Sequence, residues 1–369
     1  MARSITIAGG GIAGLSAAAA MASRGHKVAV AERSPEIRDT GAGIQISPNG
    51  FAVLAALGLG DAVRDASIRA TSVRLIDGLS GRGVLTLDLK AHAGDLEWRM
   101  IARGTLVALL AKAASAAGAQ IETGRRITPP QDRGALAGDS LLVGADGIGS
   151  TLRQIVAPST PEFTGQAAWR AVIPDPRPSS EVEVHMGPAR HLVTYSLPDN
   201  TRNIVAVQAR ESWTAEGWHH EDDPDHLRAA FKDFAPAATD LLVQVEQTHL
   251  WGLFKHPVPE RWHKGSQVLI GDAAHPTLPF LAQGANLALE DAWVLADLVD
   301  TGQEHQIGAI RLARVRRALK AAEANARNYH LSHPVIRASA FAALRIAGRL
   351  RPSAAVSRFD WLYRHDVTT

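Results

Sequence analysis

The chain has 369 residues, 46% of them hydrophobic and 21% charged, and this length predicts two domains or one large domain with an inserted lobe. The 39 Lys and Arg residues nearly balance the 37 Asp and Glu residues, which argues against a nucleic-acid partner. The absence of cysteine excludes disulfides and thiolate metal sites, and no apolar run is long enough for a membrane helix, so we expect a cytoplasmic protein.

The N-terminal residues predict a β-α-β unit with a glycine-rich turn. The expected elements are a buried strand, a helix and a second strand, at residues 4–10, 12–25 and 27–33. Gly9, Gly11 and Gly14 match the pattern G-x-G-x-x-G between the first strand and the helix. In this pattern the first glycine allows a tight turn, the second lets a pyrophosphate approach the backbone, and the third lets helix and strand pack closely.

Glu32 lies at the end of the second strand, eighteen residues after Gly14. An acid at this place accepts hydrogen bonds from the hydroxyl pair of a ribose. The preceding helix presents unpaired N–H groups and a partial positive charge to a phosphate. Together these features predict a dinucleotide site, although they do not distinguish FAD from NAD.

The following segments alternate between α/β and antiparallel patterns. A glycine-rich loop at 39–50 precedes a helix, and 70–90 predicts a hairpin. A helix at 103–118 and a buried strand at 140–147 come next. The period-two segment 181–212 predicts an antiparallel sheet with one face in water.

From Val268 the buried strand and helix pattern returns, which predicts a mixed α/β fold. In this interpretation a Rossmann-like FAD-binding domain is interrupted by an antiparallel-sheet substrate lobe and followed by a C-terminal helical segment. The FAD-binding domain is expected at 1–70, 100–165 and 265–300. The substrate lobe is expected at 71–99 and 166–264, and the C-terminal helical segment at 301–369. We expect the basic amphipathic stretch 341–359 to fold back on the body, with contact to a membrane surface as the alternative.

Two later motifs each place an aspartate at the end of a strand. Asp146 lies in "GADGIGSTLR" (144–153), and Asp272 lies in "GDAAHPTLPFLAQGAN" (271–286). Ligands of a doubly wound sheet lie beyond the carboxyl ends of its strands, so Glu32 and Asp272 are expected to face one extended ligand. Glu32 would hold an adenosine ribose, and Asp272 a second polyol such as a ribityl chain.

A long helix is expected to begin at the end of the second motif. Its first residues are Gly284, Ala285 and Asn286. A helix N-terminus carries a partial positive charge, which would stabilise negative charge on a reduced isoalloxazine ring. Pro276 and Pro279 stiffen the loop before it.

In their order and spacing, these motifs resemble the single-component FAD-dependent aromatic hydroxylases of the para-hydroxybenzoate hydroxylase superfamily. The sequence is most similar to the salicylate hydroxylase and 3-hydroxybenzoate 6-hydroxylase group. The likeness covers nearly the whole chain, including "GAGIQISPN" (41–49), "RGTL" (103–106) and "FDWLYRHD" (359–366). One departure is the segment 125–140, which is shorter than the family's usual strand pair and leaves the NAD(P)H path less defined.

The resemblance implies non-covalent FAD, NADH or NADPH as co-substrate, and dioxygen. The implied reaction is hydroxylation of a small phenolic or N-heteroaromatic carboxylic acid through a flavin C4a-hydroperoxide, by a monomer or homodimer. The cofactor contacts that it implies are Gly9, Gly11, Gly14, Glu32, Arg33, Arg103, Asp146 and Asp272, and we also expect contacts from Ala13, Gly284, Ala285 and Asn286. Pro279 matches the proline beside the reactive edge of the flavin.

The expected substrate side lies on the strand "HLVTYSL" (191–197). His191 and Tyr195 share one strand face with Val193, and the resemblance places a histidine and a tyrosine near the substrate phenol. Gln283 matches a substrate-side glutamine. A base beside the hydroxyl favours the phenolate, which attacks an electrophilic oxygen far better than the phenol does. The alternative is that these are packing residues on a half-buried sheet.

Two other functions remain open at this point. A flavoprotein of the same fold could catalyse epoxidation or reduction, and would lose its reducing equivalents as peroxide with every phenol tested. A non-catalytic FAD-binding regulator would bind flavin without oxidising NAD(P)H. No metal site is expected, because nothing places His219, His220 and the acids 221–223 on one face, and a solvated loop is the simpler interpretation.

Overall fold

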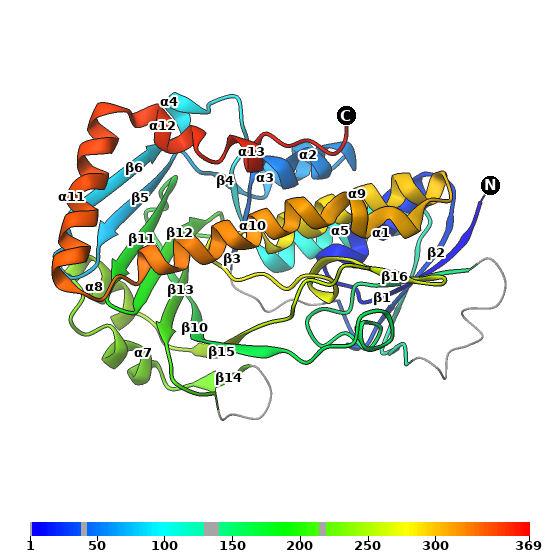
Figure 1. Cartoon of the computed structure of the whole chain (residues 1–369), viewed down its shortest axis with the longest axis horizontal. Helices are drawn as coiled ribbons and strands as arrows, with labels where there is room; N and C mark the ends of the chain where they lie inside the picture. The colour runs from blue at the N-terminus through cyan, green and yellow to red at the C-terminus, as the bar shows by residue number, and fades with distance from the viewer. Residues whose placement is uncertain (1, 38–42, 129–139, 214–218) are drawn as a thin grey trace.

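The computed structural model describes residues 2–37, 43–128, 140–213 and 219–369 (Figure 1). The segment at which the sequence departs from the family pattern lies mostly outside these residues. The described residues form sheets of six, eight and three strands with helices packed on them, so the mixed α/β class predicted from the sequence is confirmed.

The six-stranded sheet has the strand order β16-β17-β9-β1-β2-β8. Its strands are β1 (Ser4–Ala8), β2 (Lys27–Glu32), β8 (Gln120–Thr123), β9 (Leu141–Gly144), β16 (His263–Lys264) and β17 (Gln267–Leu269). All neighbouring pairs are parallel except β16 with β17. Parallel strands end at the same edge of a sheet, so the segments that follow β1, β2, β9 and β17 come together there.

Alanine-rich helix α1 packs in the centre of this part of the molecule. The helices around it are α1 (Ile12–Ser23), α5 (Arg103–Ala116) and α9 (Gly284–Asp300), and α1 contacts both of the others. Its small side chains at 17–20 are buried and allow these close contacts. The short elements α6 (Arg153–Val156), η2 (Gly271–Ala273) and η3 (Glu304–Gln306) follow β9, β17 and α9.

A small antiparallel sheet with the order β3-β7-β4 lies beside α5. It contains β3 (Gly43–Ile46), β4 (Ile68–Arg69) and β7 (Arg99–Ala102), accompanied by α2 (Pro48–Ala56), α3 (Gly60–Asp65) and α4 (Leu89–His92). Helix α2 contacts α9, so this sheet is held against the N-terminal end of the long helix.

The eight-stranded sheet has the order β14-β15-β10-β13-β12-β11-β5-β6. Its strands are β5 (Ser72–Asp77), β6 (Gly83–Asp88), β10 (Glu162–Pro174), β11 (Glu181–Gly187), β12 (Arg190–Leu197), β13 (Thr201–Ala209), β14 (His219–Asp222) and β15 (Thr248–Lys255). The predicted hairpin 70–90 is present as β5 and β6, and β5 pairs in parallel with β11. The sheet is therefore mixed, whereas the sequence predicted an antiparallel one.

The expectation that one face of this sheet is in water is wrong. On one face Leu192 packs with Phe231 beside the helices α7 (Pro224–Ala230) and α8 (Pro236–Val243). On the other face Val193 packs in a cluster with Phe341. Because helices from distant parts of the chain cover both faces, strand β12 is buried almost throughout.

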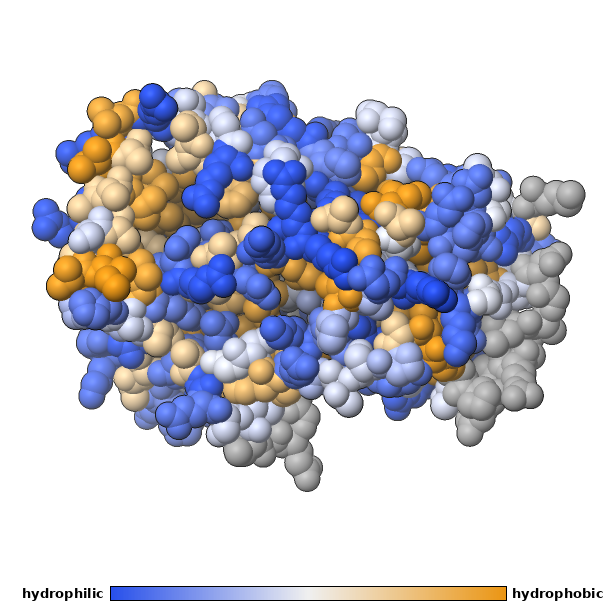
Figure 2. All heavy atoms as spheres, in the orientation of Figure 1, coloured by the Kyte–Doolittle hydropathy of each residue, from blue (hydrophilic) through white to orange (hydrophobic). Residues whose placement is uncertain are grey.

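Four helices complete the C-terminal part of the chain. They are α10 (Ile307–Tyr329), α11 (Pro334–Leu350), α12 (Pro352–Ser357) and α13 (Asp360–Tyr363). Helix α10 runs from the region of α9 to the eight-stranded sheet, and α11 then packs on β6 (Figure 1). Figure 2 shows apolar side chains gathered over α11, where Val335, Ile336, Ile346 and Leu350 are exposed. None of the described helices combines the length and hydropathy needed to cross a membrane.

Candidate functional site

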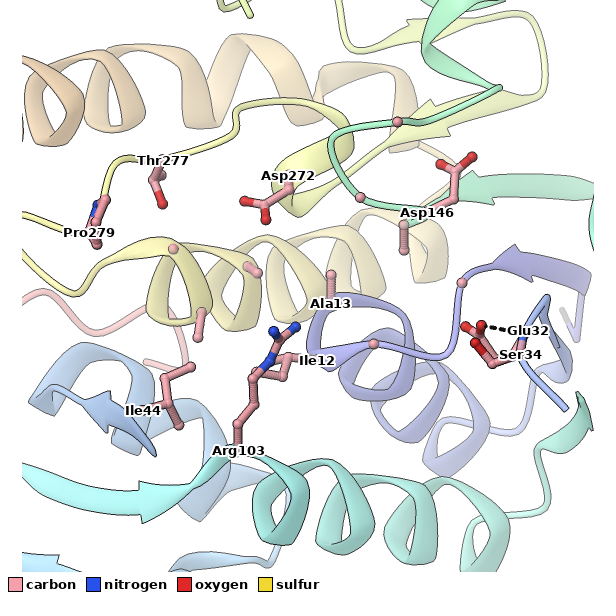
Figure 3. Close-up of a pocket in the computed structure, with 18 of the residues that line it drawn as sticks. Ile12, Ala13, Glu32, Ser34, Ile44, Arg103, Asp146, Asp272, Thr277 and Pro279 are labelled. Carbon is pink, nitrogen blue, oxygen red and sulfur yellow. Dashed lines mark hydrogen bonds between the residues drawn. The ribbon is translucent and has the colours of Figure 1, made fainter. Parts of the chain in front are cut away.

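A pocket of about 470 Å³ extends from the carboxyl edge of the parallel sheet to the eight-stranded sheet. Figure 3 shows how the turn after β1, the end of β2, the N-terminus of α5 and the loop before α9 enclose it. Of the residues predicted from the sequence, those that line it are Gly9, Gly11, Ala13, Glu32, Arg33, Arg103, Asp146, His191, Tyr195, Asp272, Pro279, Gly284 and Ala285. Gly14, Gln283 and Asn286 are not among its lining residues.

The three glycines after β1 have different surroundings. Gly9 has a φ of +109°, and a Cβ there would lie 2.4 Å from the carbonyl oxygen of Ala145. A Cβ on Gly14 would lie 2.0 Å from the carbonyl oxygen of Gly9. A Cβ on Gly11 would meet no atom of the described residues within 4 Å, because this residue begins α1 at the pocket wall. Gly9 and Gly14 thus permit the tight turn, while Gly11 keeps the space beside the helix N-terminus open.

The carboxylate of Glu32 is fixed at one end of the pocket. Its Oε2 accepts a 2.7 Å hydrogen bond from the N–H of Gly10, and its Oε1 accepts one of 2.8 Å from the N–H of Ser34 (Figure 3). A carboxylate has about four lone-pair sites, so two remain for ligand hydroxyls.

Asp272 and Arg103 approach the middle of the pocket from opposite walls (Figure 3). Burial raises the pKa of Asp272, and electrostatic interactions with His275, Arg103 and Arg170 oppose this shift only in part. A carboxylate in such a place gains from hydrogen-bond donors, which the hydroxyls of a polyol provide.

Asp146 lines the wall that follows β9. Its Oδ2 accepts a 2.8 Å hydrogen bond from the N–H of Thr151, while its buried Oδ1 has no partner among the described residues. An unpaired buried oxygen indicates a missing donor. The open space at Gly11, the carboxylates of Glu32 and Asp272, and this oxygen all fit an extended ligand that carries hydroxyls and a pyrophosphate, as FAD does.

The N-terminus of α9 reaches the pocket through Gly284 and Ala285. A Cβ on Gly284 would lie 2.5 Å from Oγ1 of Thr277, so a glycine is needed where the loop folds over the helix start. Pro279, in the same loop, lines the pocket. The partial positive charge of this 17-residue helix is therefore directed at the pocket.

Asn286 does not contact the pocket, contrary to the sequence-based expectation. Its Oδ1 accepts a hydrogen bond from the N–H of Ser47, and its Nδ2 donates to the carbonyl oxygens of Gln45 and Ala282. The side chain is fully buried. Asn286 thus joins the loop before α9 to the segment at the end of β3, and it holds this part of the pocket wall in place without lining the pocket.

Gln283 is also held away from the pocket. Its Nε2 donates to Oγ of Ser47 at 2.9 Å, and its Oε1 accepts from Nδ2 of Asn49 at 3.1 Å. Asn49 in turn donates to the buried carboxylate of Glu290. Because the Gln283 amide uses both of its ends in this network, the geometry does not support the substrate contact expected for it.

His191, Val193 and Tyr195 line the pocket from β12, as the alternation of the strand predicts. His191 and Tyr195 are 1% and 3% exposed. Burial lowers the pKa of His191 and raises that of Tyr195, so both side chains are neutral near pH 7. They lie on either side of Val193 in this wall.

Two further polar residues were missed in the sequence: one lines this end of the pocket, and the other contacts His191 from outside the pocket lining. Arg170 of β10 lies in the same cross-strand row as Val205 and Val193, which both line the pocket with it. His330 follows α10, and its Nε2 lies 2.7 Å from Nδ1 of His191. The alternation of β10 indicates which residues share a face with Arg170, but strand register and the path of α10 are not visible in the sequence.

The histidine and acid cluster at 219–223 forms part of strand β14 and the cap of α7, where a solvated loop was expected. Among the described residues, no group of three or more His, Asp or Glu side chains is arranged to hold a metal ion.

Comparison with known proteins agrees with this geometry. A family model described as an FAD binding domain matches residues 3–302. The 3-amino-4-hydroxybenzoate 2-monooxygenase of Streptomyces cremeus is 32% identical over 352 residues, which cover 89% of this chain and 88% of that protein. The 3-hydroxybenzoate 6-hydroxylase 1 of Aquipseudomonas alcaligenes is 28% identical, with 98% of each chain covered.

Among solved structures, HpxO of Klebsiella pneumoniae complexed with FAD and uric acid superposes with a TM-score of 0.80 at 23% identity, and 94% of each chain is covered. This likeness concerns the fold. The match to the family model and the identity to the Streptomyces enzyme show that the chain belongs to the FAD-dependent aromatic monooxygenases of the para-hydroxybenzoate hydroxylase type.

Proposed function

We propose that this monooxygenase uses NAD(P)H, FAD and dioxygen to hydroxylate a small phenolic or N-heteroaromatic carboxylic acid. The observation that supports this most directly is the continuity of the pocket, which joins the glycine turn and Asp272 to the polar pair His191 and Tyr195. Such a pocket would hold a dinucleotide along the glycine turn and a small ring at its far end. Relatives named for hydroxybenzoates and hydroxynicotinates support this class of substrate.

In this proposal the six-stranded sheet and its helices hold FAD. Gly11 and the start of α1 receive the pyrophosphate, Glu32 accepts bonds from the adenosine ribose, and Asp272 accepts bonds from the ribityl chain. The other proposed cofactor contacts are Gly9, Ala13, Arg33, Arg103, Asp146, Gly284 and Ala285. When bound there, FAD would supply the redox chemistry between NAD(P)H and dioxygen. Pro279, which lines the same pocket, would lie beside the flavin ring.

The eight-stranded sheet orients the substrate. His191 accepts the hydroxyl proton of the phenol, and Tyr195 donates a hydrogen bond from its hydroxyl, which stays protonated because burial raises its pKa. Loss of the proton makes the ring a stronger nucleophile toward the oxygen that it accepts. Arg170 adds positive charge to the same wall and favours a carboxylate on the ring.

A substrate panel with the FAD-loaded enzyme tests the proposal. The panel contains hydroxybenzoates, aminohydroxybenzoates and hydroxynicotinates, each assayed with NADH and with NADPH. We expect one class to accelerate NAD(P)H oxidation and to give a hydroxylated product in near-equal amount. NAD(P)H oxidation that yields only peroxide with every compound would favour another chemistry on this fold. Bound FAD with no oxidation of NAD(P)H would favour a regulator.

A further inference from the structure

The imidazole of His191 is paired with a second imidazole that the proposed function does not use. Nδ1 of His191 lies 2.7 Å from Nε2 of His330, and the ring centroids are 5.0 Å apart. At this distance one nitrogen carries the proton and the other accepts it. Because the bond occupies Nδ1 of His191, the nitrogen left for a ligand is Nε2.

The two rings differ in their surroundings. His191 is 1% exposed and packs against the rings of Phe280 and Tyr329, with centroid distances of 5.4 and 5.3 Å. His330 is partly exposed at the C-terminal cap of α10. Burial lowers the pKa of His330 to about 4 and lowers that of His191 well below its ordinary value, so both rings are neutral near pH 7.

A proton accepted by His191 alone would leave a positive charge in this aromatic wall. A buried unpaired charge is strongly disfavoured, so His191 is a weak base unless it can pass the accepted proton to another group. His330 is better placed for a transient positive charge, because it is nearer to solvent and the C-terminus of a 23-residue helix carries a partial negative charge. The hydrogen bond between the rings connects these two environments.

We propose that His330 is a positioning residue that relays the substrate's hydroxyl proton from His191 toward solvent, an inference that rests on the proposed function. The phenol O–H bond breaks, its electron pair stays on the oxygen, and the proton binds Nε2 of His191. Nδ1 of His191 gives its own proton to Nε2 of His330, and Nδ1 of His330 releases a proton to water. Both rings end neutral with the opposite tautomer, and the reverse transfers reset them when the product is protonated.

Proton release on substrate binding tests this relay in the FAD-loaded enzyme. The enzyme is mixed with 3-amino-4-hydroxybenzoate in weak buffer containing phenol red, and the colour change is followed by stopped flow. His330→Gln keeps a hydrogen-bond partner for His191 but cannot relay a proton, and we expect release at least tenfold slower with similar substrate affinity. His330→Ala should be equally slow, and added imidazole should accelerate it. His92→Gln, an exposed histidine on α4, is the matched control and should behave as the wild type.

The other outcomes separate the relay from the proposed function. Wild-type release by His330→Gln, or a His330→Ala variant that imidazole does not accelerate, would show that the contact only orients His191, and would overturn the relay. Unchanged release by His191→Ala, or no release by the wild type, would place the error in the substrate site itself, and the relay would fall with it.

Discussion

The imidazole of His275 bonds to the carboxylate of Asp291, with Nε2 2.5 Å from Oδ2 and both side chains fully buried. The N–H of Gly271 donates to the same oxygen, and Nε of Arg311 donates to Oδ1 at 2.7 Å. The loop that begins at Gly271 is therefore tied to the interior of α9. This bond fixes the backbone on either side of Asp272 and leaves that carboxylate for the pocket.

Asp291→Ala should destabilise the fold strongly. It leaves the Arg311 guanidinium and His275 buried without this carboxylate, and removal of one partner of a buried ion pair costs about 3–5 kcal/mol. Urea unfolding of both proteins measures the difference. Asp297→Ala is the control on the same helix, because its carboxylate is half exposed beside Arg24 and its loss should cost about 0–1 kcal/mol. Equal losses for the two variants would contradict this account.

The same cluster makes stability depend on pH in the acid range. Burial raises the pKa of Asp291, but His275 and Arg311 outweigh it, so the pKa is below its ordinary value in the folded chain. The pKa of Glu290 is also below its ordinary value, because Arg314 and Arg311 outweigh the opposing effect of burial. The unfolded chain therefore binds protons at these two carboxylates more tightly than the folded chain does. The stability that they contribute is complete above a pH of about 4 and is lost as the pH falls through their folded-state pKa values. The urea midpoint should decline below that pH, and less steeply in Asp291→Ala. Parallel declines would show that other carboxylates are responsible.

Gly11→Ala and Gly14→Ala should distinguish loss of space for the ligand from loss of packing within the protein. A methyl group on Gly11 has no atom within 4 Å in the part of the chain that the structure describes, so the unfolding free energy without FAD should stay near that of the wild type. FAD affinity should fall by about tenfold or more. A methyl group on Gly14 collides with the carbonyl oxygen of Gly9, so this variant should lose stability even without FAD. Fluorescence titration with FAD and thermal unfolding of the apoprotein provide the two measurements. If Gly11→Ala bound FAD normally, the pyrophosphate would not lie at this turn.

Asp272→Ala should weaken FAD binding because the carboxylate that faces the pocket is lost. Hydrogen bonds to charged groups are worth about 1.5–3 kcal/mol, so the affinity should fall by about tenfold or more. Asp272→Asn keeps one acceptor and should lose less. Acid precipitation of the wild type should release all of the flavin, as expected for non-covalent binding. An unchanged FAD dissociation constant in Asp272→Ala would refute the assignment of this residue to the ribityl chain.

The sequence was sufficient where a residue's place in the pocket depends on local geometry. The turn at Gly9, the open wall at Gly11 and the shared face of His191 and Tyr195 all follow from patterns of a few residues. Asp272 could be placed because the edge of a parallel sheet brings strand ends together even when they are far apart in the chain.

The sequence-based predictions that the structure contradicts depend on contacts between distant segments of the chain. Gln283 and Asn286 lie in the same motif as Asp272, but their partners Ser47 and Asn49 belong to the segment after β3, and nothing in the motif reveals that pairing. For the same reason β12 was expected to have a wet face, since the helices that cover it come from other parts of the chain. His330 was missed because its pairing with His191 depends on where a 23-residue helix ends.

The proposed roles of His191 and Tyr195 can be tested by substitution. His191→Ala and Tyr195→Phe should leave FAD binding intact, because both residues lie on the eight-stranded sheet and not beside the glycine turn. Hydroxylation should fall by about a hundredfold or more if a positioned base is lost, whereas NAD(P)H oxidation should fall less. The difference should appear as hydrogen peroxide, because reduced enzyme still reacts with dioxygen when the ring has not been activated. Product formed per NAD(P)H consumed measures this ratio directly. Thr194→Val, on the opposite face of the same strand, is the matched control and should keep the wild-type ratio. If both pocket variants also kept that ratio, His191 and Tyr195 would be packing residues, and the substrate would have to bind elsewhere in the pocket.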